Sequence, residues 1–298
     1  MSLRKLCATA LVLLCTAGLC HAHIYNETSG TSEDTDAELY EWDLSLRTSL
    51  TGSQATYRNW SQGGVDNIAL LGSVGFGSRY ETERYVFNHS TSLRYGQTRI
   101  GDGDFIKSDD IIRLRNQLRR KFSDERFGAI LNVNFETQFG RGYDDPAPPE
   151  GEPRILISRF MAPAYLNQVL GVSYNPDRYF RAETGLAMKQ TISADTDLSP
   201  LFGLDEDQNF RNEAGFSILL GYERQIMENI YYSGFAETFT NVNKPLSSTD
   251  FLIVNELTGR INQYISANIE LALAYNDDIT DDLQVKQIIS VGFSYTFL

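Results

Sequence analysis

The sequence predicts an all-β fold, an antiparallel transmembrane β-barrel of about twelve strands that its C-terminal strand closes. The first indication is a unit of roughly 10 to 14 residues with alternating apolar and polar side chains, which recurs from Leu39 onward. The second is a strict alternation of short and long connections. The third is the last segment, residues 284–297, where Ile289, Val291 and Phe293 share one face and mostly small or polar residues occupy the other.

An export signal is predicted at the N-terminus. A positively charged start is followed by an apolar run over residues 6–19, which is too short to span a bilayer, and then by a small-residue cleavage site. We therefore expect residues 1–22 to be a signal peptide that is cleaved after Ala22. A lipoprotein signal that uses Cys15 or Cys20 is the alternative, although each of these cysteines follows Leu where Gly or Ala would be wanted.

The rest of the chain divides into a tail and a barrel. Residues 23–38 are polar and acidic and are expected to form a flexible periplasmic segment, and residues 39–298 the barrel. Every cysteine lies in the signal, so the mature chain would have no disulfide, thiol nucleophile or cysteine metal site. Because His23 and His89 are its only histidines, we expect no metal and no cofactor. With 39 Asp+Glu against 26 Lys+Arg the chain is acidic, which argues against a nucleic-acid partner.

Residues 109–122 are the most telling of the predicted strands. Arg113, Arg115 and Arg119 alternate with apolar side chains along this segment. No soluble core would take a face with so many cations, and a helix would scatter them all round. Asn116 interrupts the opposite, apolar face. The alternation therefore indicates a wall with lipid on one side and a polar interior on the other.

The other strands follow the same logic, with Leu, Val, Ile, Phe and Tyr on the face toward lipid. Residues 155–174 contain Pro163, and we predict a single bent or bulged strand there, because proline removes a donor from the hydrogen-bond ladder. The predicted strands are residues 39–52, 67–77, 84–96, 109–122, 127–140, 155–174, 179–189, 212–224, 230–240, 250–262, 264–275 and 284–297.

The connections support this count independently. Short ones are predicted to be periplasmic turns and long ones, rich in Asp, Gly, Pro, Ser or Asn, to be outer loops, with both termini in the periplasm. The short connections are residues 80–84, 123–126, 175–178, 224–229 and 262–264, and the long ones are residues 53–66, 97–108, 141–154, 190–211, 241–249 and 276–283.

The inner face of the predicted barrel carries charges of both signs. One interpretation is a polar pore or ligand-binding lumen whose basic wall favours anions. The other is a lumen filled by its own salt bridges and hydrogen bonds, as in small barrels. The candidate lumen-lining residues are Arg47, Arg94, Arg113, Arg115, Arg119, Lys121, Glu136, Arg181, Glu183, Glu213, Glu223, Glu256 and Glu270.

His89 raises the question of an enzyme, because a His–Ser pair occurs in outer-membrane lipid hydrolases. Ser90 points to the opposite face of the strand from His89, whereas Thr91 shares its face. A nucleophile needs its base within hydrogen-bond reach. We therefore expect no enzymatic activity and no catalytic residue, and interpret His89 as a histidine on the barrel wall.

The run Asn59-Trp60-Ser61-Gln62-Gly63-Gly64 stands out, because tryptophan is rare here and paired glycines imply special backbone angles. Together with the glycine-spaced strand at residues 70–76, it resembles the Asn-Trp-x-x-Gly-Gly signature of the family called domain of unknown function 3078. Residues 160–166 and 170–174 are similar to the middle segment of that family. The resemblance implies a Gram-negative outer-membrane β-protein without an assigned activity and with no catalytic residues to carry over.

Taken together, these observations predict an integral protein of the outer membrane of a Gram-negative bacterium. The leading functional hypothesis is a non-enzymatic narrow channel or small-solute or lipid-binding envelope protein. The alternative is a closed structural or surface-contact barrel whose outer loops bind a partner, and a third hypothesis is an outer-membrane lipid hydrolase. Expected partners are outer-membrane lipid and the barrel-assembly machinery, which would recognise the C-terminal strand.

Overall fold

The computed structural model describes residues 39–56, 66–144, 154–276, 278 and 280–296. It is a closed antiparallel barrel of twelve strands, in the order β1-β14-β13-β12-β11-β10-β9-β8-β5-β4-β3-β2. The predicted fold class and strand number are therefore confirmed. The barrel strands are β1 (Trp42–Ala55), β2 (Asn67–Glu81), β3 (Tyr85–Ile100), β4 (Ile106–Lys121), β5 (Phe127–Thr137), β8 (Ala164–Tyr174), β9 (Phe180–Ile192), β10 (Phe210–Met227), β11 (Ile230–Asn241), β12 (Asp250–Arg260), β13 (Ile265–Asn276) and β14 (Thr280–Thr296).

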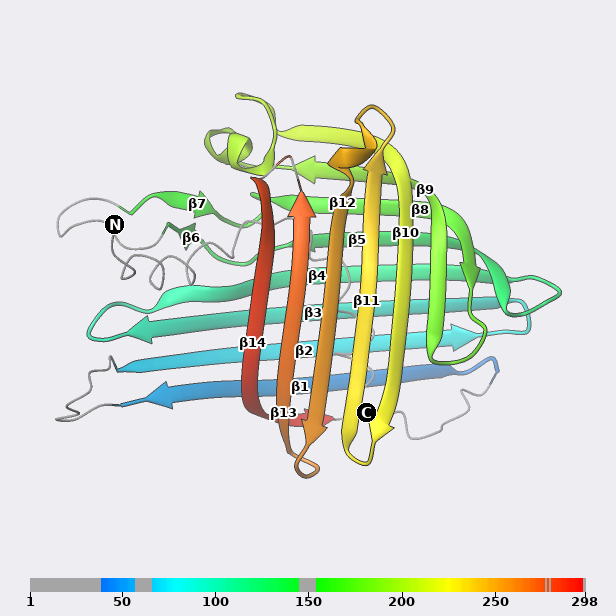
Figure 1. The fold of residues 1–298 in the computed structure, drawn as a ribbon, viewed down its shortest axis with the longest axis horizontal. Coiled ribbons are helices and arrows are strands. Elements are labelled where there is room, and N and C mark those ends of the chain that lie inside the picture. Colours follow the sequence, from blue (N-terminus) through cyan, green and yellow to red (C-terminus); the bar gives the residue numbers. More distant parts are fainter. Residues whose placement is uncertain (1–38, 57–65, 145–153, 277, 279, 297–298) are drawn as a thin grey trace.

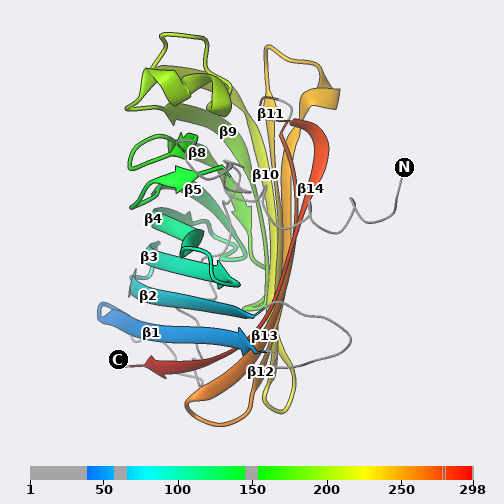
Figure 2. The ribbon, with the colours of Figure 1, turned by 90° about the vertical axis from the view of Figure 1, so that its left-hand side faces the viewer.

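The strands form two facing walls that cross each other. Figure 1 shows β10–β14 running across β1–β5, and Figure 2 shows the same two walls from the side. Crossing walls are what steeply tilted strands produce when a barrel is viewed from its flank. Among the described residues, no helix has the length and apolar character needed to cross a membrane.

The distribution of apolar side chains is the reverse of that in a soluble protein. Leu170, Leu186 and Ile289 point outward and are 63%, 61% and 71% exposed. Arg113 and Glu183, on the inner face, are only 1% and 6% exposed. Lipid can cover the apolar outer face, whereas the enclosed polar face needs partners within the protein.

Closure depends on a short seam between the first and last strands. β1 pairs with β14 only from Arg47↔Thr296 to Thr51↔Gly292, whereas β1 pairs with β2 along its whole length, from Trp42↔Tyr80 to Ala55↔Asn67. The C-terminal strand closes the barrel, as predicted, and every barrel strand thereby gains a neighbour on each side.

Aromatic side chains gather near the strand ends. At the end of the barrel with the short turns, Trp42 lies 5.0 Å from Tyr80 and 6.2 Å from Phe87 between ring centroids. Phe251 and Tyr275 stack at 5.9 Å at the end with the long loops. Such rings favour the boundary between lipid and water, so these pairs mark the two interfaces of the lipid-facing belt.

The prediction of one bent strand over residues 155–174 is wrong. The segment contains two strands, β7 (Leu156–Ser158) and β8, and β7 pairs with β6 (Gly142–Tyr143) in a separate two-stranded sheet. Arg159 and Ala162 exchange backbone hydrogen bonds of 2.8 and 2.9 Å in a tight turn between them. Pro163 follows that turn and has no N–H for a ladder, so only the chain after it joins the barrel.

The described part of the connection between β5 and β8 packs against the connection between β9 and β10. Between β9 and β10 lies the short 3₁₀-helix η2 (Thr196–Phe202). Its Leu198 and Phe202 form a buried cluster with Ala162 and Leu204, and Leu156 of β7 packs on that cluster. This end of the molecule therefore carries a small apolar core of its own outside the barrel.

Candidate functional site in the lumen

Strand register decides which side chains face the interior. Arg113 stands opposite Ser92 and Glu136, and Glu136 in turn stands opposite Tyr165. Following these pairs around the barrel places each candidate lumen residue on the same inner face. The candidate motif Asn59, Trp60, Gly63 and Gly64, the predicted signal peptide and the whole predicted tail lie outside the described residues.

The end of the lumen nearest the long loops is crossed by a buried ion pair. Lys189 Nζ of β9 lies 2.7 Å from Asp250 Oδ2 of β12, and both residues are 3% exposed. β10 and β11 stand between these two strands in the barrel, so the pair is a chord across the lumen rather than a bond between neighbours. It connects β9 with β12 across the interior.

A second chord lies deeper. Gln117 of β4 donates to Glu183 Oε1 of β9 at 2.9 Å, and Asn132 of β5 donates to Glu183 Oε2 at 2.9 Å. β5 and β8 stand between β4 and β9, so the first of these bonds also spans the interior. Beside it, Arg113 Nε donates to Glu136 Oε2 at 2.8 Å.

The remaining candidates bond near one or the other end. Arg94 pairs with Asp109 at 2.5 Å. Arg211 pairs with both Glu213, at 3.1 Å, and Asp278, at 2.8 Å. Toward the short turns, Lys121 pairs with Glu81 at 2.6 Å and Arg119 donates to Ser173 at 2.9 Å. Glu270 pairs with Lys286 of the neighbouring strand at 3.3 Å, Glu256 accepts from Thr258 at 3.3 Å, and Arg47, Arg181 and Glu223 also interact with their surroundings.

The charges of the inner face are therefore arranged largely in pairs. Sequence reasoning identified many of the cations and several carboxylates, but it did not include the cations Arg211 and Lys286 among the candidates. It also missed the carboxylates Glu237, Asp250 and Asp278. The signal that could have found Glu237 and Asp250 is their position in the alternation, since Glu237 stands opposite Leu252 and Asp250 belongs to the same face of β12.

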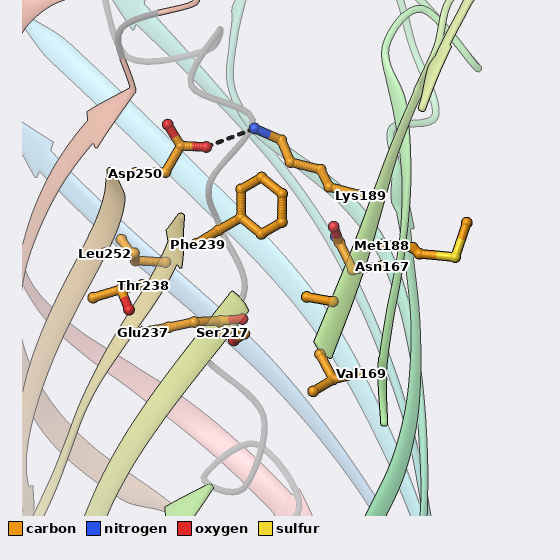
Figure 3. A pocket seen from close by; sticks show the side chains of 11 residues that line it. Asn167, Val169, Met188, Lys189, Ser217, Glu237, Thr238, Phe239, Asp250 and Leu252 are labelled. Carbon is orange, nitrogen blue, oxygen red and sulfur yellow. Dashed lines mark hydrogen bonds and ion pairs between the residues drawn. The ribbon is translucent and has the colours of Figure 1, made fainter. Parts of the chain in front are cut away.

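A pocket opens in the lumen beside the Lys189–Asp250 chord. Figure 3 shows the chord at its edge, Phe239 beneath the lysine, and Met188 pointing away from the pocket. Lys189 Nζ lies 5.4 Å from the centre of the Phe239 ring, a cation–π contact. The lining residues are Asn167, Val169, Ala187, Met188, Lys189, Ser217, Glu237, Thr238, Phe239, Asp250 and Leu252.

The lumen also contains an apolar patch. Phe235, Leu252, Val254 and Ala274 form a buried cluster on β11, β12 and β13. These residues share the inner face with the charged pairs, because Phe235 stands opposite Val254 and Leu252 opposite Ala274. One wall of the interior is thus partly apolar, while β4 and β9 on the other side are rich in cations.

Outside the barrel, His89 belongs to a hydrogen-bonded group on the lipid-facing surface. Its Nδ1 lies 2.9 Å from Asn116 Oδ1, and its Nε2 lies 3.0 Å from Thr91 Oγ1. Asn116 stands directly opposite His89 in the register of β3 and β4. Ser90 faces the interior opposite Arg115, so the hydroxyl within reach of the imidazole is that of Thr91.

Replacing Asn116 by leucine is expected to lower the free energy of unfolding by about 1–3 kcal/mol, because an imidazole N–H would then face lipid without an acceptor. Urea titration of the folded barrel in lipid vesicles measures this loss. In the double variant His89→Leu and Asn116→Leu both partners become apolar, and most of the stability should return. Equal losses in the single and double variants would contradict this account.

Asp278 ties three loop regions together at the outer end. It accepts hydrogen bonds from Arg211 Nη2 at 2.8 Å and from Lys244. Burial alone would raise the pKa of Asp278, but the hydrogen bond from Lys244 and the charges of Arg211 and Lys244 lower the pKa below its ordinary value of 3.8. The carboxylate is thus stabilised in its ionised form.

The lowered pKa of Asp278 makes the stability of the fold depend on pH in a definite direction. Because the folded-state pKa of Asp278 is depressed, its contribution to stability is complete above the ordinary pKa of 3.8 and is lost as the pH falls through the lower, folded-state value. We expect Asp278→Asn to be less stable than the wild type at pH 7 and the difference to shrink in strong acid. Urea unfolding at a series of pH values measures the difference, and a gap that is independent of pH would refute the prediction.

A search among curated proteins finds no match. Among solved structures, an outer membrane channel from Pseudomonas putida F1 is similar with a TM-score of 0.41 and 8% identity over 89% of this chain and 98% of that one. The NanC porin is similar with a TM-score of 0.37 and 8% identity over 84% of this chain and 98% of that one. The translocator domain of the autotransporter NalP from Neisseria meningitidis has a TM-score of 0.37 and 12% identity over 86% of this chain and 88% of that one.

These structural likenesses are too distant to support an argument about function. In sequence, residues 53–143 match the family described as "Protein of unknown function (DUF3078)". This stretch contains the Asn59–Gly64 run and the glycine-spaced strand that follows it. The resemblance to this family of unknown function, seen in the motifs of the sequence, is thereby confirmed over residues 53–143.

Proposed function

We propose that the protein is a non-enzymatic, narrow channel or small-solute-binding barrel in the outer membrane of a Gram-negative bacterium, exported with a cleaved signal peptide. The observation that carries this proposal is that side-chain contacts cross the lumen. Two chords, Lys189–Asp250 and Gln117–Glu183, restrict the interior, and a partly apolar pocket lies beside the first of them. Such an interior suits a small solute and excludes a wide aqueous pore.

The test is single-channel recording in planar bilayers with the refolded protein. Small, discrete conductance steps are the expected result. The sample should first show the heat-dependent mobility shift of a folded barrel, so that silence cannot be attributed to misfolding. A folded sample without any conductance steps would overturn the channel hypothesis. A solute-binding barrel or a closed barrel would then remain.

A closed, surface-contact barrel is the second candidate, and the folded outer loops favour it. The cluster of Ala162, Leu198, Phe202 and Leu204 holds together the described segments that precede β8 and β10, and Phe160 and Leu201 beside it are 55% and 43% exposed. A lipid hydrolase would need Thr91 as its nucleophile, and a His89→Ala variant that lost measurable lipid hydrolysis would support it. In each case the lipid-facing belt contacts membrane lipid, and the C-terminal strand is the segment that we expect the barrel-assembly machinery to recognise.

A further inference from the structure

Two arginines share one tyrosine at the end of the barrel with the short turns. The guanidinium carbon of Arg178, in the turn between β8 and β9, lies 5.0 Å from the ring centre of Tyr179. The guanidinium carbon of Arg224, near the end of β10, lies 4.9 Å from the same centre. Both arginines are exposed, whereas Tyr179 is half-buried. The two cations therefore lie within about 10 Å of each other on the surface of the barrel.

Further contacts restrict both guanidinium groups. Arg178 Nη2 donates to the Tyr179 hydroxyl at 2.9 Å. Arg224 forms a hydrogen bond with the side chain of Tyr222, a residue of the same strand. A guanidinium has five N–H donors in one plane, and the Tyr222 contact of Arg224 uses only part of this set. Groups that are held in place before binding lose less conformational entropy when a ligand arrives.

Arg224 belongs to the lipid-facing side of β10. Gly221 stands opposite Arg181, a residue of the inner face, so the even-numbered residues of this strand up to Arg224 point outward. Beyond Arg224 the chain is apolar again, because Ile226 and Met227 are 49% and 64% exposed. The cation thus has apolar side chains on both sides of it along the strand, which places it at the level where lipid chains meet their headgroups.

The carboxylates near this site do not cancel its charge. Asp177 Oδ1 accepts from the backbone N–H groups of Tyr179, at 2.8 Å, and Phe180, at 2.9 Å, and its charge also acts on Arg224. Glu223 belongs to the inner face and interacts with its surroundings there. Within the described part of the chain, Asp177 is thus the carboxylate seen to act on Arg224.

We infer that Arg178 and Arg224 bind the phosphate of a phospholipid headgroup on the outside of the barrel, an inference that rests on the proposed location in the membrane. Phosphate oxygens accept charge-assisted hydrogen bonds from guanidinium groups, often two at a time. The acyl chains lie along the outward face of β10, where Ile218 and Leu220 are exposed. A neutral lipid lacks the charge and free phosphate lacks the chains, so the site favours a ligand that has both.

The binding test uses the folded wild-type barrel, stripped of lipid in detergent micelles, and native mass spectrometry with three probes. Dioctanoyl phosphatidylglycerol carries phosphate and chains, dioctanoylglycerol carries chains alone, and inorganic phosphate carries charge alone. Phosphatidylglycerol is expected to bind at least about tenfold more tightly than either of the others. Equal binding of dioctanoylglycerol would mean that only the chains are recognised, and equal binding of inorganic phosphate would mean a site for free anions. Either result would overturn the inference.

Variants assign the phosphate to its residues. Arg224→Gln should weaken phosphatidylglycerol binding about tenfold, and Arg178→Gln with Arg224→Gln should abolish the preference over dioctanoylglycerol. Arg126→Gln is the matched control, because Arg126 is exposed at the turn between β4 and β5 but already pairs with Asp124 at 2.7 Å. It should keep the preference. If Arg126→Gln and the double variant lost affinity equally, the inference would be wrong. If a variant does not fold, the three probes on the wild type still decide.

The outcome is separable from that of the proposed channel. Conductance steps in a barrel that binds phosphatidylglycerol and dioctanoylglycerol alike would leave the channel standing and overturn the phospholipid site. A preference for phosphatidylglycerol in a folded barrel without conductance would support the site and overturn the channel.

Discussion

Lys189→Ala is expected to give the largest rise in conductance of any single substitution in the lumen. The change removes the chord between β9 and β12 and leaves Asp250 buried without its cation. An uncompensated buried carboxylate costs roughly 3–5 kcal/mol, so water should enter around Asp250 and widen the outer end of the lumen. Planar-bilayer recording should show larger steps and a shift toward cation selectivity.

Removing the charge of the other partner, Asp250, should shift the ion selectivity in the opposite direction. Asp250→Asn leaves the charge of Lys189 unbalanced, so conductance should rise while selectivity shifts toward anions. The double variant Lys189→Met and Asp250→Leu removes the chord without changing the net charge. It should widen the lumen with little change in selectivity, which separates the steric role of the chord from its charge.

Lys286→Ala provides the control. Lys286 pairs with Glu270 at 3.3 Å, but the two residues lie on neighbouring strands β13 and β14, so their bond does not cross the lumen. Its loss should leave step size nearly unchanged. If Lys189→Ala and Lys286→Ala behaved alike in folded samples, the chord would not be what restricts the lumen.

Period-two alternation was enough to predict the barrel, because each strand has lipid on one side and polar neighbours on the other. It predicted β4 best, where Arg113, Arg115 and Arg119 leave only one face for lipid. It was least informative on β11, whose inner face carries Phe235 and Phe239 beside Glu237, while Thr238 and Thr240 face outward. A strand face that carries both apolar and charged residues does not indicate whether it points toward lipid or toward the lumen.

Period-two alternation could not predict the folded loops or the contacts that cross the lumen. The sheet of β6 and β7 consists of only two and three residues, which is too short for any periodic signal. The partners Lys189 and Asp250 lie 61 positions apart in the chain. Their meeting depends on tilt and stagger, which set the pairs that face each other across a barrel and which alternation within one strand does not encode.

The second large effect is expected at a pair of glycines. Gly171 of β8 and Gly185 of β9 stand directly opposite each other. A Cβ on Gly171 would lie 2.6 Å from the Cα of Gly185, and a Cβ on Gly185 would lie 2.6 Å from the Cα of Gly171. Because the obstructing atoms belong to the backbone, no side-chain rotation relieves the clash, and the two strands must move apart.

We therefore expect Gly171→Ala to cost at least the roughly 1–3 kcal/mol typical of overpacking, and Gly171→Val to prevent formation of the heat-modifiable folded form. Gly259→Ala is the matched control, because a Cβ there would meet only Ala267 O, at 3.9 Å. The double variant Gly171→Ala and Gly185→Ala should cost less than the sum of the single losses, since either methyl group alone already separates the strands. Fully additive losses in urea unfolding would mean that the two glycines act independently and that their close approach does not set the spacing of β8 and β9.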